Sequence, residues 1–283
     1  MIAVRRPDER GPIGVFDSGV GGLTVLRALR AALPERRFIY LGDTARLPYG
    51  TKSAESVARY SVQCAEALVA RGIGCLVVAC NTASASALGA LRARYAHLPV
   101  IGVIEPGAAA AVAASRSGHV AVIGTEGTIG GGAYQAALQR LSPEVRVTAQ
   151  ACSLFVAMAE EGWVDGPIAE SVARRYLEPM FSAAAPHASP DTLVLGCTHF
   201  PVLVPAIRAV LPASVTIVDS AASVAAVVAR EAAIVSKPSG GEVASARGSV
   251  QWLATDGAQR FARVSSVFLG TALHAADIEI IDL

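Results

Sequence analysis

Cys80 and Cys197 stand out because each follows a short apolar run and precedes small polar residues. The run 77–79 leads into Cys80-Asn-Thr, and the run 194–196 leads into Cys197-Thr-His. The two segments lie about one compact domain's length apart, which indicates an internal repeat of two lobes, with chance similarity as the alternative. We expect a helix to begin just after each cysteine, where the partial positive charge of the helix N-terminus stabilises a thiolate. The two segments therefore predict a pair of activated thiols.

Two such thiols are compatible with four kinds of chemistry. They could form a redox couple, although neither has a second cysteine nearby in the sequence. Cys197, His199 and Asp17 could bind a metal, although no pair has a strong zinc-ligand spacing. A cysteine with a basic histidine could be a hydrolytic nucleophile. Two thiols on opposite sides of one carbon could also invert a stereocentre, one removing a proton as a thiolate and the other donating one, with the roles exchanged in the reverse direction.

The other three cysteines, Cys64, Cys75 and Cys152, are interpreted as small buried hydrophobic residues. The five cysteines include no Cys-x-x-Cys pair, so their spacing indicates neither a disulfide framework nor a zinc ribbon. We therefore expect all five to be free thiols in a reducing compartment.

Further polar residues follow the predicted strands. His199 could tune Cys197 or relay protons to it, and Asp17 could play the matching role for Cys80. Hydroxyl, amide and backbone N–H groups at helix starts can hold a carboxylate without arginine. The turn at 48–50 could bring its backbone close to a ligand, with an ordinary surface turn as the alternative. The residues expected from these positions to contact a small polar substrate are Ser18, Asn81, Thr82 and Thr198.

The elements that must position these residues are short β-branched runs alternating with helical stretches. The predicted strands are 13–17, 38–42, 76–79, 100–104, 120–124, 145–149, 193–196, 215–219 and 250–253. This alternation predicts an α/β fold with largely parallel sheets flanked by helices. Such sheets bind ligands at the carboxyl ends of their strands, where the polar residues above lie.

The glycine-rich turn 19–22 is an incomplete nucleotide-binding motif. A dinucleotide-binding G-x-G-x-x-G pattern starting at Gly19 would need glycine where Thr24 stands, and Asp17 would bring a carboxylate near the pyrophosphate. No Gly-Lys-Ser/Thr ending of a P-loop is present. A tight turn that starts a helix close to the strand is the simpler interpretation.

Length and charge narrow the class of protein. The 283 residues suffice for two mid-sized domains, or one large one, and 24 basic against 23 acidic residues give a net charge of +1, which does not favour a nucleic-acid binder. The uncharged stretch 72–91 contains Asn, Thr, Ser and Gly, so it is interpreted as a strand and helix rather than a membrane span. The charged N-terminus lacks a signal-peptide core. We expect a cytoplasmic protein without membrane or nucleic-acid partners.

Six motifs occur in order along the chain: 14–24 (GVFDSGVGGLT), 41–52 (LGDTARLPYGTK), 79–83 (ACNTA), 102–106 (GVIEP), 124–129 (GTEGTI) and 195–203 (LGCTHFPVL). Together, and over nearly the whole chain, they resemble the cofactor-independent aspartate/glutamate racemase family. The resemblance implies interconversion of L- and D-glutamate for bacterial peptidoglycan, with no cofactor and no metal.

The resemblance also implies roles for single residues. It maps the catalytic residues of the family onto Cys80, Cys197, Asp17, His199 and Glu160, with adjacent Glu161 as the alternative to Glu160. Its substrate-contacting pairs map onto Asp17-Ser18, Tyr49-Gly50, Asn81-Thr82 and Thr198-His199. Two departures affect the second-lobe wall of the pocket. Ser153 and Ala157 replace prolines that are usual in the segment carrying the glutamate, and the glycines 130–132 replace a more polar stretch.

The fold that the resemblance implies is two similar α/β lobes, each a mostly parallel sheet flanked by helices, with the active site in the cleft between them. The expected first lobe comprises residues 1–104 and 215–283, and the second comprises 105–214. A homodimer with glutamate as its substrate is expected. The alternatives are an aspartate or related amino-acid racemase of the same fold, or a non-catalytic two-lobed amino-acid-binding protein, which would need neither cysteine.

Overall fold

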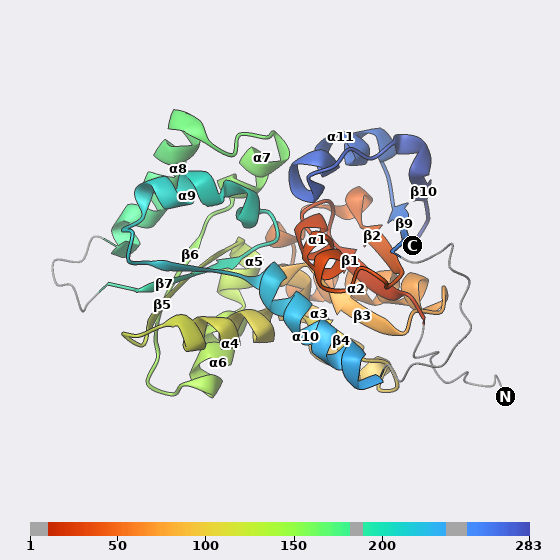
Figure 1. The fold of residues 1–283 in the computed structure, drawn as a ribbon, viewed down its shortest axis with the longest axis horizontal. Helices are drawn as coiled ribbons and strands as arrows, with labels where there is room; N and C mark the ends of the chain where they lie inside the picture. The colour runs from red at the N-terminus through yellow and green to blue at the C-terminus, as the bar shows by residue number, and fades with distance from the viewer. Residues whose placement is uncertain (1–10, 182–188, 236–247) are drawn as a thin grey trace.

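Two parallel sheets flanked by helices make up the protein (Figure 1). The computed structural model describes residues 11–181, 189–235 and 248–283. The first sheet has the strand order β10-β9-β2-β1-β3-β4 and contains β1 (Ile13–Asp17), β2 (Phe38–Gly42), β3 (Cys75–Val78), β4 (Val100–Gly102), β9 (Val250–Ala254) and β10 (Ile278–Ile280). The second has the order β6-β5-β7-β8 and contains β5 (His119–Gly124), β6 (Arg146–Ala151), β7 (Thr192–Gly196) and β8 (Thr216–Asp219). Every strand pair in both sheets is parallel.

The helices fall into two groups. The first sheet is packed by α1 (Leu23–Ala32), α2 (Ala54–Val69), α3 (Asn81–Arg94) and α11 (Ala258–Leu269). The second is packed by α4 (Ile104–Ala114), α5 (Glu126–Gly130), α6 (Ala133–Leu141), α7 (Leu154–Glu160), α8 (Gly166–Phe181) and α9 (Val204–Val210). The last helix, α10 (Ser220–Val235), runs from the boundary between the halves along α1 (Figure 1).

The predicted α/β class with parallel sheets is confirmed. All nine predicted strands are present, with bounds that differ from the expected ones by a residue or two. The tenth strand, β10, was not predicted. It has only three residues, pairs at the edge of the sheet with β9 alone, and two of its three side chains are exposed. A strand this short at an edge carries too little apolar pattern to be recognised.

The position of β8 corrects one predicted lobe boundary. Thr216 lies beside Thr192 and Val218 beside Val194, so β8 is the edge strand of the second sheet. The expected boundary at 215 assigned these residues to the first lobe. The chain returns to the first lobe only afterwards, through α10, which packs on α1. We propose that the lobes divide near residue 104 and again just after Asp219.

Alternating residues of the central strands enter two different cores. Val15 of β1 packs in a cluster with Leu23 and Leu26 of α1, whereas its neighbour Phe16 packs in a second cluster with Leu68 of α2. All five residues of β1 are buried, as expected for a parallel strand covered on both faces. Packing on both faces holds each central strand in place. The loop that follows the strand is positioned as a result.

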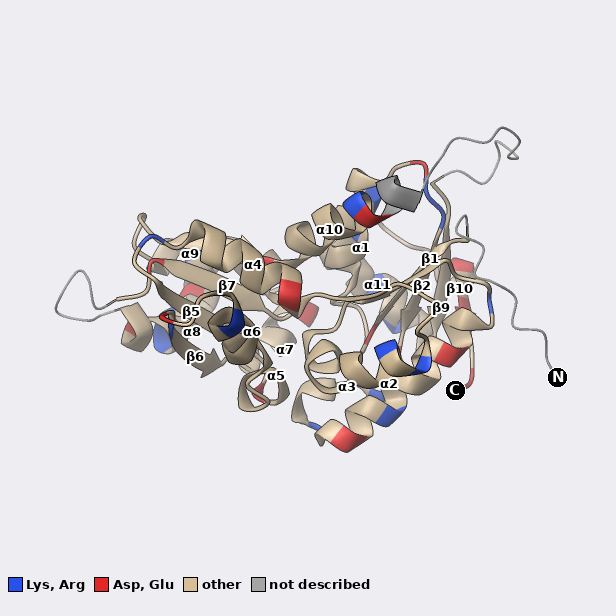
Figure 2. Cartoon of the chain, turned by 90° about the horizontal axis from the view of Figure 1, so that it is seen from below, with Lys and Arg blue, Asp and Glu red and all other residues tan. Residues whose placement is uncertain are grey.

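Those loops meet between the lobes. One cavity is lined by residues that follow β1 and β3 of the first sheet and by residues that follow β7 of the second. The carboxyl edges of the two sheets therefore face each other, at the place predicted for the site. Away from it, acidic and basic residues are interspersed over both lobes (Figure 2). Within the described residues, no helix combines the length and apolarity that crossing a membrane requires.

Candidate active site

The cavity between the lobes brings together nearly all of the predicted site residues. Its walls include Ser18, Tyr49, Gly50, Cys80, Asn81, Thr82, Glu160, Cys197, Thr198 and His199, with Gly19, Leu47, Pro48, Thr125 and Val156 completing the lining. Asp17 is the exception, because it is fully buried behind the wall. Cys64, Cys75 and Cys152 lie outside the lining, and all five cysteines are free thiols.

Cys80 is held at the first turn of α3. It is the N-cap residue of this helix, and its Sγ accepts a hydrogen bond from the backbone N–H of Ala83 (3.5 Å) while lying 3.7 Å from Ser18 Oγ. The helix begins directly after the cysteine, as predicted. The expected lowering of its pKa is wrong, because burial and the nearby Asp17 carboxylate raise the pKa of Cys80 to about 12. Cys80 is therefore a protonated thiol at neutral pH when the cavity is empty.

Cys197 has a different environment from Cys80. The predicted helix does not begin at once: a turn and a 3₁₀ segment, Phe200–Leu203, precede α9. The partner of Cys197 is instead a side chain, since His199 Nδ1 lies 3.8 Å from its Sγ. A protonated imidazole stabilises an adjacent thiolate more directly than a distant helix end does.

His199 is linked in turn to Glu160. Its Nε2 lies 3.1 Å from Glu160 Oε1, and both side chains are almost completely buried. Burial alone would lower the pKa of His199, but hydrogen bonds to Cys197 and Glu160 and the charges of Cys197 and Asp17 outweigh it and raise the pKa to about 10. The imidazole is therefore protonated at neutral pH. The adjacent Glu161 is exposed, so the geometry favours Glu160 as the assisting acid.

Asp17 is buried behind the cavity wall. Its carboxylate accepts hydrogen bonds from the backbone N–H of Gly19 (3.0 Å) and from the hydroxyl of Thr198 (3.3 Å). Burial raises its pKa, although His199 and these hydrogen bonds oppose the effect. The Asp17 carboxylate therefore raises the pKa of Cys80 and holds the Thr198 hydroxyl, and it does not line the cavity. The metal site considered from sequence for Cys197, His199 and Asp17 is not supported, since no group of three or more potential ligands in the described residues could hold a metal ion.

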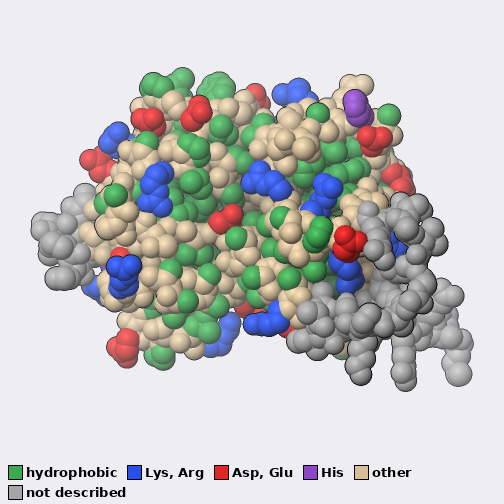
Figure 3. Space-filling view, in the orientation of Figure 1, with side chains coloured by type: hydrophobic (Ala, Val, Ile, Leu, Met, Phe, Trp, Pro, Cys, Tyr) green, Lys and Arg blue, Asp and Glu red, His purple; other side chains and the backbone are tan. Residues whose placement is uncertain are grey.

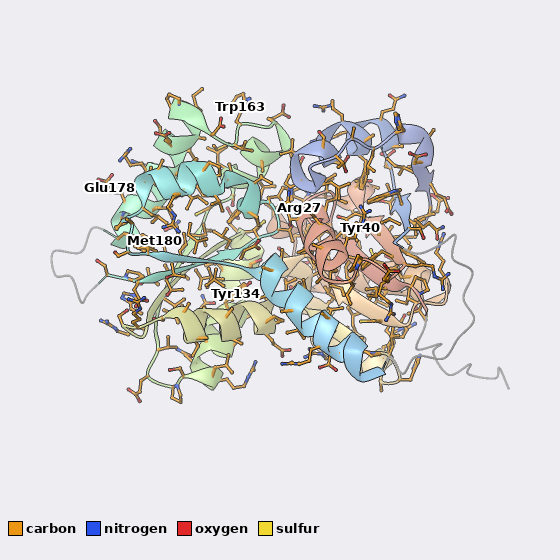
Figure 4. The ribbon with its side chains drawn as sticks, viewed as in Figure 1. Arg27, Tyr40, Tyr134, Trp163, Glu178 and Met180 are labelled. Atoms are coloured by element: carbon orange, nitrogen blue, oxygen red, sulfur yellow. The ribbon has the colours of Figure 1, made fainter. Side chains whose placement is uncertain are left out.

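Asn81 lines the cavity and carries an unsatisfied buried donor. Its Oδ1 accepts a hydrogen bond from the hydroxyl of Tyr134, which extends from α6 of the other lobe (Figure 4), at 2.9 Å. This bond orients the amide so that Nδ2 is buried with no hydrogen-bond partner among the described residues. A buried unpaired donor is costly, so a ligand acceptor is expected to satisfy it. Tyr134 was not predicted, because only the tertiary fold brings it to Asn81.

Tyr49 and Gly50 form part of the cavity wall for different reasons. The Tyr49 hydroxyl donates to the buried Asp43 carboxylate, which also binds Arg46 (2.7 Å), so the aromatic ring is fixed from behind. Gly50 lies against Thr125 of the other lobe, and a Cβ at Gly50 would come within 2.7 Å of the Thr125 Cβ. The glycine therefore permits a close approach of the two lobes at this turn, and the predicted approach of its backbone to a ligand stays a prediction.

Gly21 explains the glycine-rich turn after β1. A Cβ at this position would overlap the hydroxyl of Thr198 and the imidazole of His199 from the other lobe. Close to it, the hydroxyl of Thr24 donates to the carbonyl of Thr198 (3.0 Å). The glycine-rich turn thus packs against the Cys197 loop of the other lobe. This contact, rather than nucleotide binding or a tight turn alone, accounts for the glycine at position 21.

Gly21→Ala should therefore damage the site without unfolding the protein. The added methyl group must displace Thr198 and His199, and a shift of about 1 Å in catalytic groups costs about 10²-fold in turnover. The unfolding free energy should fall by about 1–3 kcal/mol, the usual cost of overpacking. Gly89→Ala is the matched control, because nothing lies near a Cβ at that position in α3. Wild-type turnover in Gly21→Ala would contradict the role of this glycine.

Comparisons with known proteins agree with this geometry. The family model described as Asp/Glu/Hydantoin racemase matches residues 15–228. The chain is 51% identical to a glutamate racemase of Geobacter metallireducens, over 92% of this chain and 93% of that one. Among solved structures, glutamate racemase from Bacillus anthracis superposes with a TM-score of 0.85 at 33% identity, covering 97% of this chain and 98% of that one. The Francisella tularensis enzyme, solved with D-glutamate, gives 0.84 at 32% identity, with the same coverage. The chain belongs to the Asp/Glu/Hydantoin racemase family.

Proposed function

We propose that this protein is a glutamate racemase that interconverts L- and D-glutamate with two thiols. The observation that carries the proposal is that Cys80 and Cys197 line one cavity from opposite lobes, each with its own polar partners. The relatives from Geobacter metallireducens and Francisella tularensis support glutamate as the substrate. A binding protein would need neither thiol.

The two thiols suit opposite roles in the empty enzyme. The positive charge of His199 faces Cys197 and suits it to act as the base, whereas burial and Asp17 raise the pKa of Cys80 and suit it to act as the acid. In one direction the Cys197 thiolate removes the Cα proton and becomes a thiol. The electron pair left on Cα spreads onto the substrate carboxylate, and the Cys80 thiol then delivers its proton to the opposite face, leaving a thiolate. In the other direction the roles are exchanged, and no cofactor takes part.

The substrate would be held by neutral donors rather than by basic side chains. Asn81 Nδ2 is the buried donor without a partner, and Ser18, Thr82 and Thr198 add hydroxyls to the same cavity. Such donors stabilise the negative charge that develops on the carboxylate oxygens as the proton leaves. We propose these groups, with Tyr49, Gly50 and His199, as the substrate-binding residues. Asp17 supports them from behind through Thr198.

Hydrogen exchange tests the proposal directly. Fresh, reduced protein incubated with L-glutamate in D₂O, without added cofactor, should yield D-glutamate that carries deuterium at Cα. Chiral chromatography coupled to mass spectrometry measures both products. The same assay on aspartate and alanine tests substrate choice, with glutamate expected to turn over fastest. Neither inversion nor exchange with any of the three would reject the racemase proposal.

We further propose that the enzyme supplies D-glutamate for peptidoglycan and works in the cytoplasm as a homodimer. Its curated relative from Geobacter metallireducens is a bacterial enzyme, which supports the cell-wall role.

The homodimer is supported by exposed apolar residues of the second lobe. Trp163 is 57% exposed and is labelled at the upper edge of this lobe in Figure 4. The exposed Leu154 and Ile168 lie near it in sequence. Figure 3 shows apolar side chains at the same edge, and such side chains favour self-association. Light scattering of the full chain should give the mass of two protomers, and a mass of one protomer would reject the homodimer.

A further inference from the structure

Arg260 and Glu160 form an ion pair that joins the two lobes. Arg260 is the third residue of α11 in the first lobe, and Glu160 is the last residue of α7 in the second. Arg260 Nη2 donates to Glu160 Oε2 at 2.6 Å. The Glu160 side chain is only 12% exposed, whereas that of Arg260 is 54% exposed. The guanidinium therefore reaches from the surface of one lobe to a nearly buried carboxylate of the other.

The two oxygens of Glu160 have different partners. Oε2 accepts from Arg260, and Oε1 faces His199 Nε2 at 3.1 Å. Holding one oxygen fixes the rotation of the carboxylate, and so aims the other at the imidazole. His199 in turn faces Cys197 through Nδ1. The four side chains therefore form a series of direct contacts that runs from the exposed Arg260 to the Cys197 thiol.

Arg260 lies on the far side of Glu160 from the substrate cavity. It is absent from the lining of that cavity, and it lines a separate one with Asp256 and Phe261. Glu160 and Leu47 line both cavities and so form the wall between them. Any effect of Arg260 on the reaction must therefore pass through Glu160.

We propose that Arg260 is a positioning residue, and that its ion pair with Glu160 makes acid–base catalysis by Cys197 depend on closure of the lobes. The proposal rests on the two-thiol function given above. His199 and Glu160 belong to the second lobe and stay together when the lobes separate, but Arg260 leaves with the first lobe. Only the closed molecule then keeps Glu160 oriented toward His199, and His199 toward Cys197. The direct partners of the Cys80 thiol, Ser18 and the backbone of α3, belong to the first lobe and do not include Arg260.

Steady-state kinetics of three variants tests this role. Arg260→Gln should lower kcat by about 10–10²-fold, as expected when the partner that orients a site residue is removed, and leave KM nearly unchanged because Arg260 does not face the substrate. Arg260→Lys, which keeps the charge, should recover most of the loss. Arg263→Gln is the matched control, since Arg263 is exposed on the same helix and joins no ion pair among the described residues. Combining Arg260→Gln with Glu160→Gln should be no worse than Glu160→Gln alone.

Isotope effects separate this role from a general loss of structure. Enantiomers have equal free energies, so kcat/KM must fall equally in both directions. Arg260→Gln should, however, slow only the proton transfer at Cys197. With Cα-deuterated substrates, the variant should therefore show a larger isotope effect on kcat/KM for one enantiomer and a smaller one for the other. Unchanged kcat, or isotope effects that move in the same direction, would overturn the proposal. A melting temperature lowered without these kinetic changes would assign Arg260 a purely structural role. A wild-type enzyme that does not racemise glutamate would instead reject the underlying function.

Discussion

Replacing Cys80 or Cys197 by serine should each abolish measurable racemisation, with a loss of about 10²–10⁴-fold or more. A serine hydroxyl is a far poorer base than a thiolate, and inversion needs one group on each face of Cα. Both side chains are almost fully buried, and serine is slightly smaller, so the fold should tolerate the change. The variants are compared with Cys152→Ser, which changes a buried cysteine outside the cavity. Racemisation is measured as the change in circular dichroism of glutamate.

Exchange without inversion distinguishes a two-thiol mechanism from a single-base mechanism. Each serine variant keeps one thiol, which can still remove and return the proton on its own face of the substrate. In D₂O, Cys80→Ser should therefore exchange the Cα proton of one enantiomer, and Cys197→Ser that of the other. If both variants exchange the same enantiomer, or if either racemises at the wild-type rate, the assignment of one thiol to each face is wrong.

The two thiols perform a symmetric reaction in asymmetric surroundings. Cys80 depends on a helix start, Ser18 and the buried charge of Asp17, whereas Cys197 depends on the imidazolium of His199. Each lobe supplies one thiol, but the supporting groups differ. This difference suits Cys80 to be the acid and Cys197 the base in one direction, and the other direction requires the opposite protonation of the pair.

Much of the site could be predicted because parallel strands place their ends at one edge of a sheet. The apolar runs before Asp17, Cys80 and Cys197 identify strands, and the residues directly after each strand must lie at that edge. The same alternation of strands and helices predicted the fold class. The assignment of β8 to a lobe was wrong, because the sequence pattern identified the strand but not the sheet to which it belongs. That information lies in the pairing with β7, which is a tertiary contact.

The remaining site features depend on contacts between lobes that leave no local pattern. Tyr134 and Arg260 lie within ordinary helical segments, and neither helix alone indicates a partner across the cleft. The pKa of Cys80 was predicted in the wrong direction because the helix N-terminus is visible in the sequence, whereas the burial and the Asp17 charge that outweigh it are not. The helix start and the desolvation compete, and only the fold decides which is larger.

His199→Gln should lower kcat/KM by about 10²–10⁴-fold at neutral pH and change the shape of the pH–rate profile. Glutamine can reach Glu160 but cannot carry the positive charge that faces Cys197 and Asp17. In the wild type, activity should fall as the pH rises through about 10, where the imidazolium loses its proton. In the variant this fall should be absent, because glutamine has no proton to lose in this range. Parallel profiles, measured over about pH 6–11 to span both protonation states of the imidazole, would contradict this role.

The same proton must appear in the stability of the protein. The pKa of His199 is raised from 6.5 to about 10 on folding, so the folded state binds this proton more tightly than the unfolded chain does. The resulting stabilisation is complete below pH 6.5 and is lost progressively as the pH rises through about 10. Urea unfolding should therefore show the wild type more stable than His199→Gln near pH 6, with the difference shrinking toward pH 10. A gap that stays constant with pH would mean that the histidine is neutral in the folded enzyme, and the role of its positive charge beside Cys197 would be rejected.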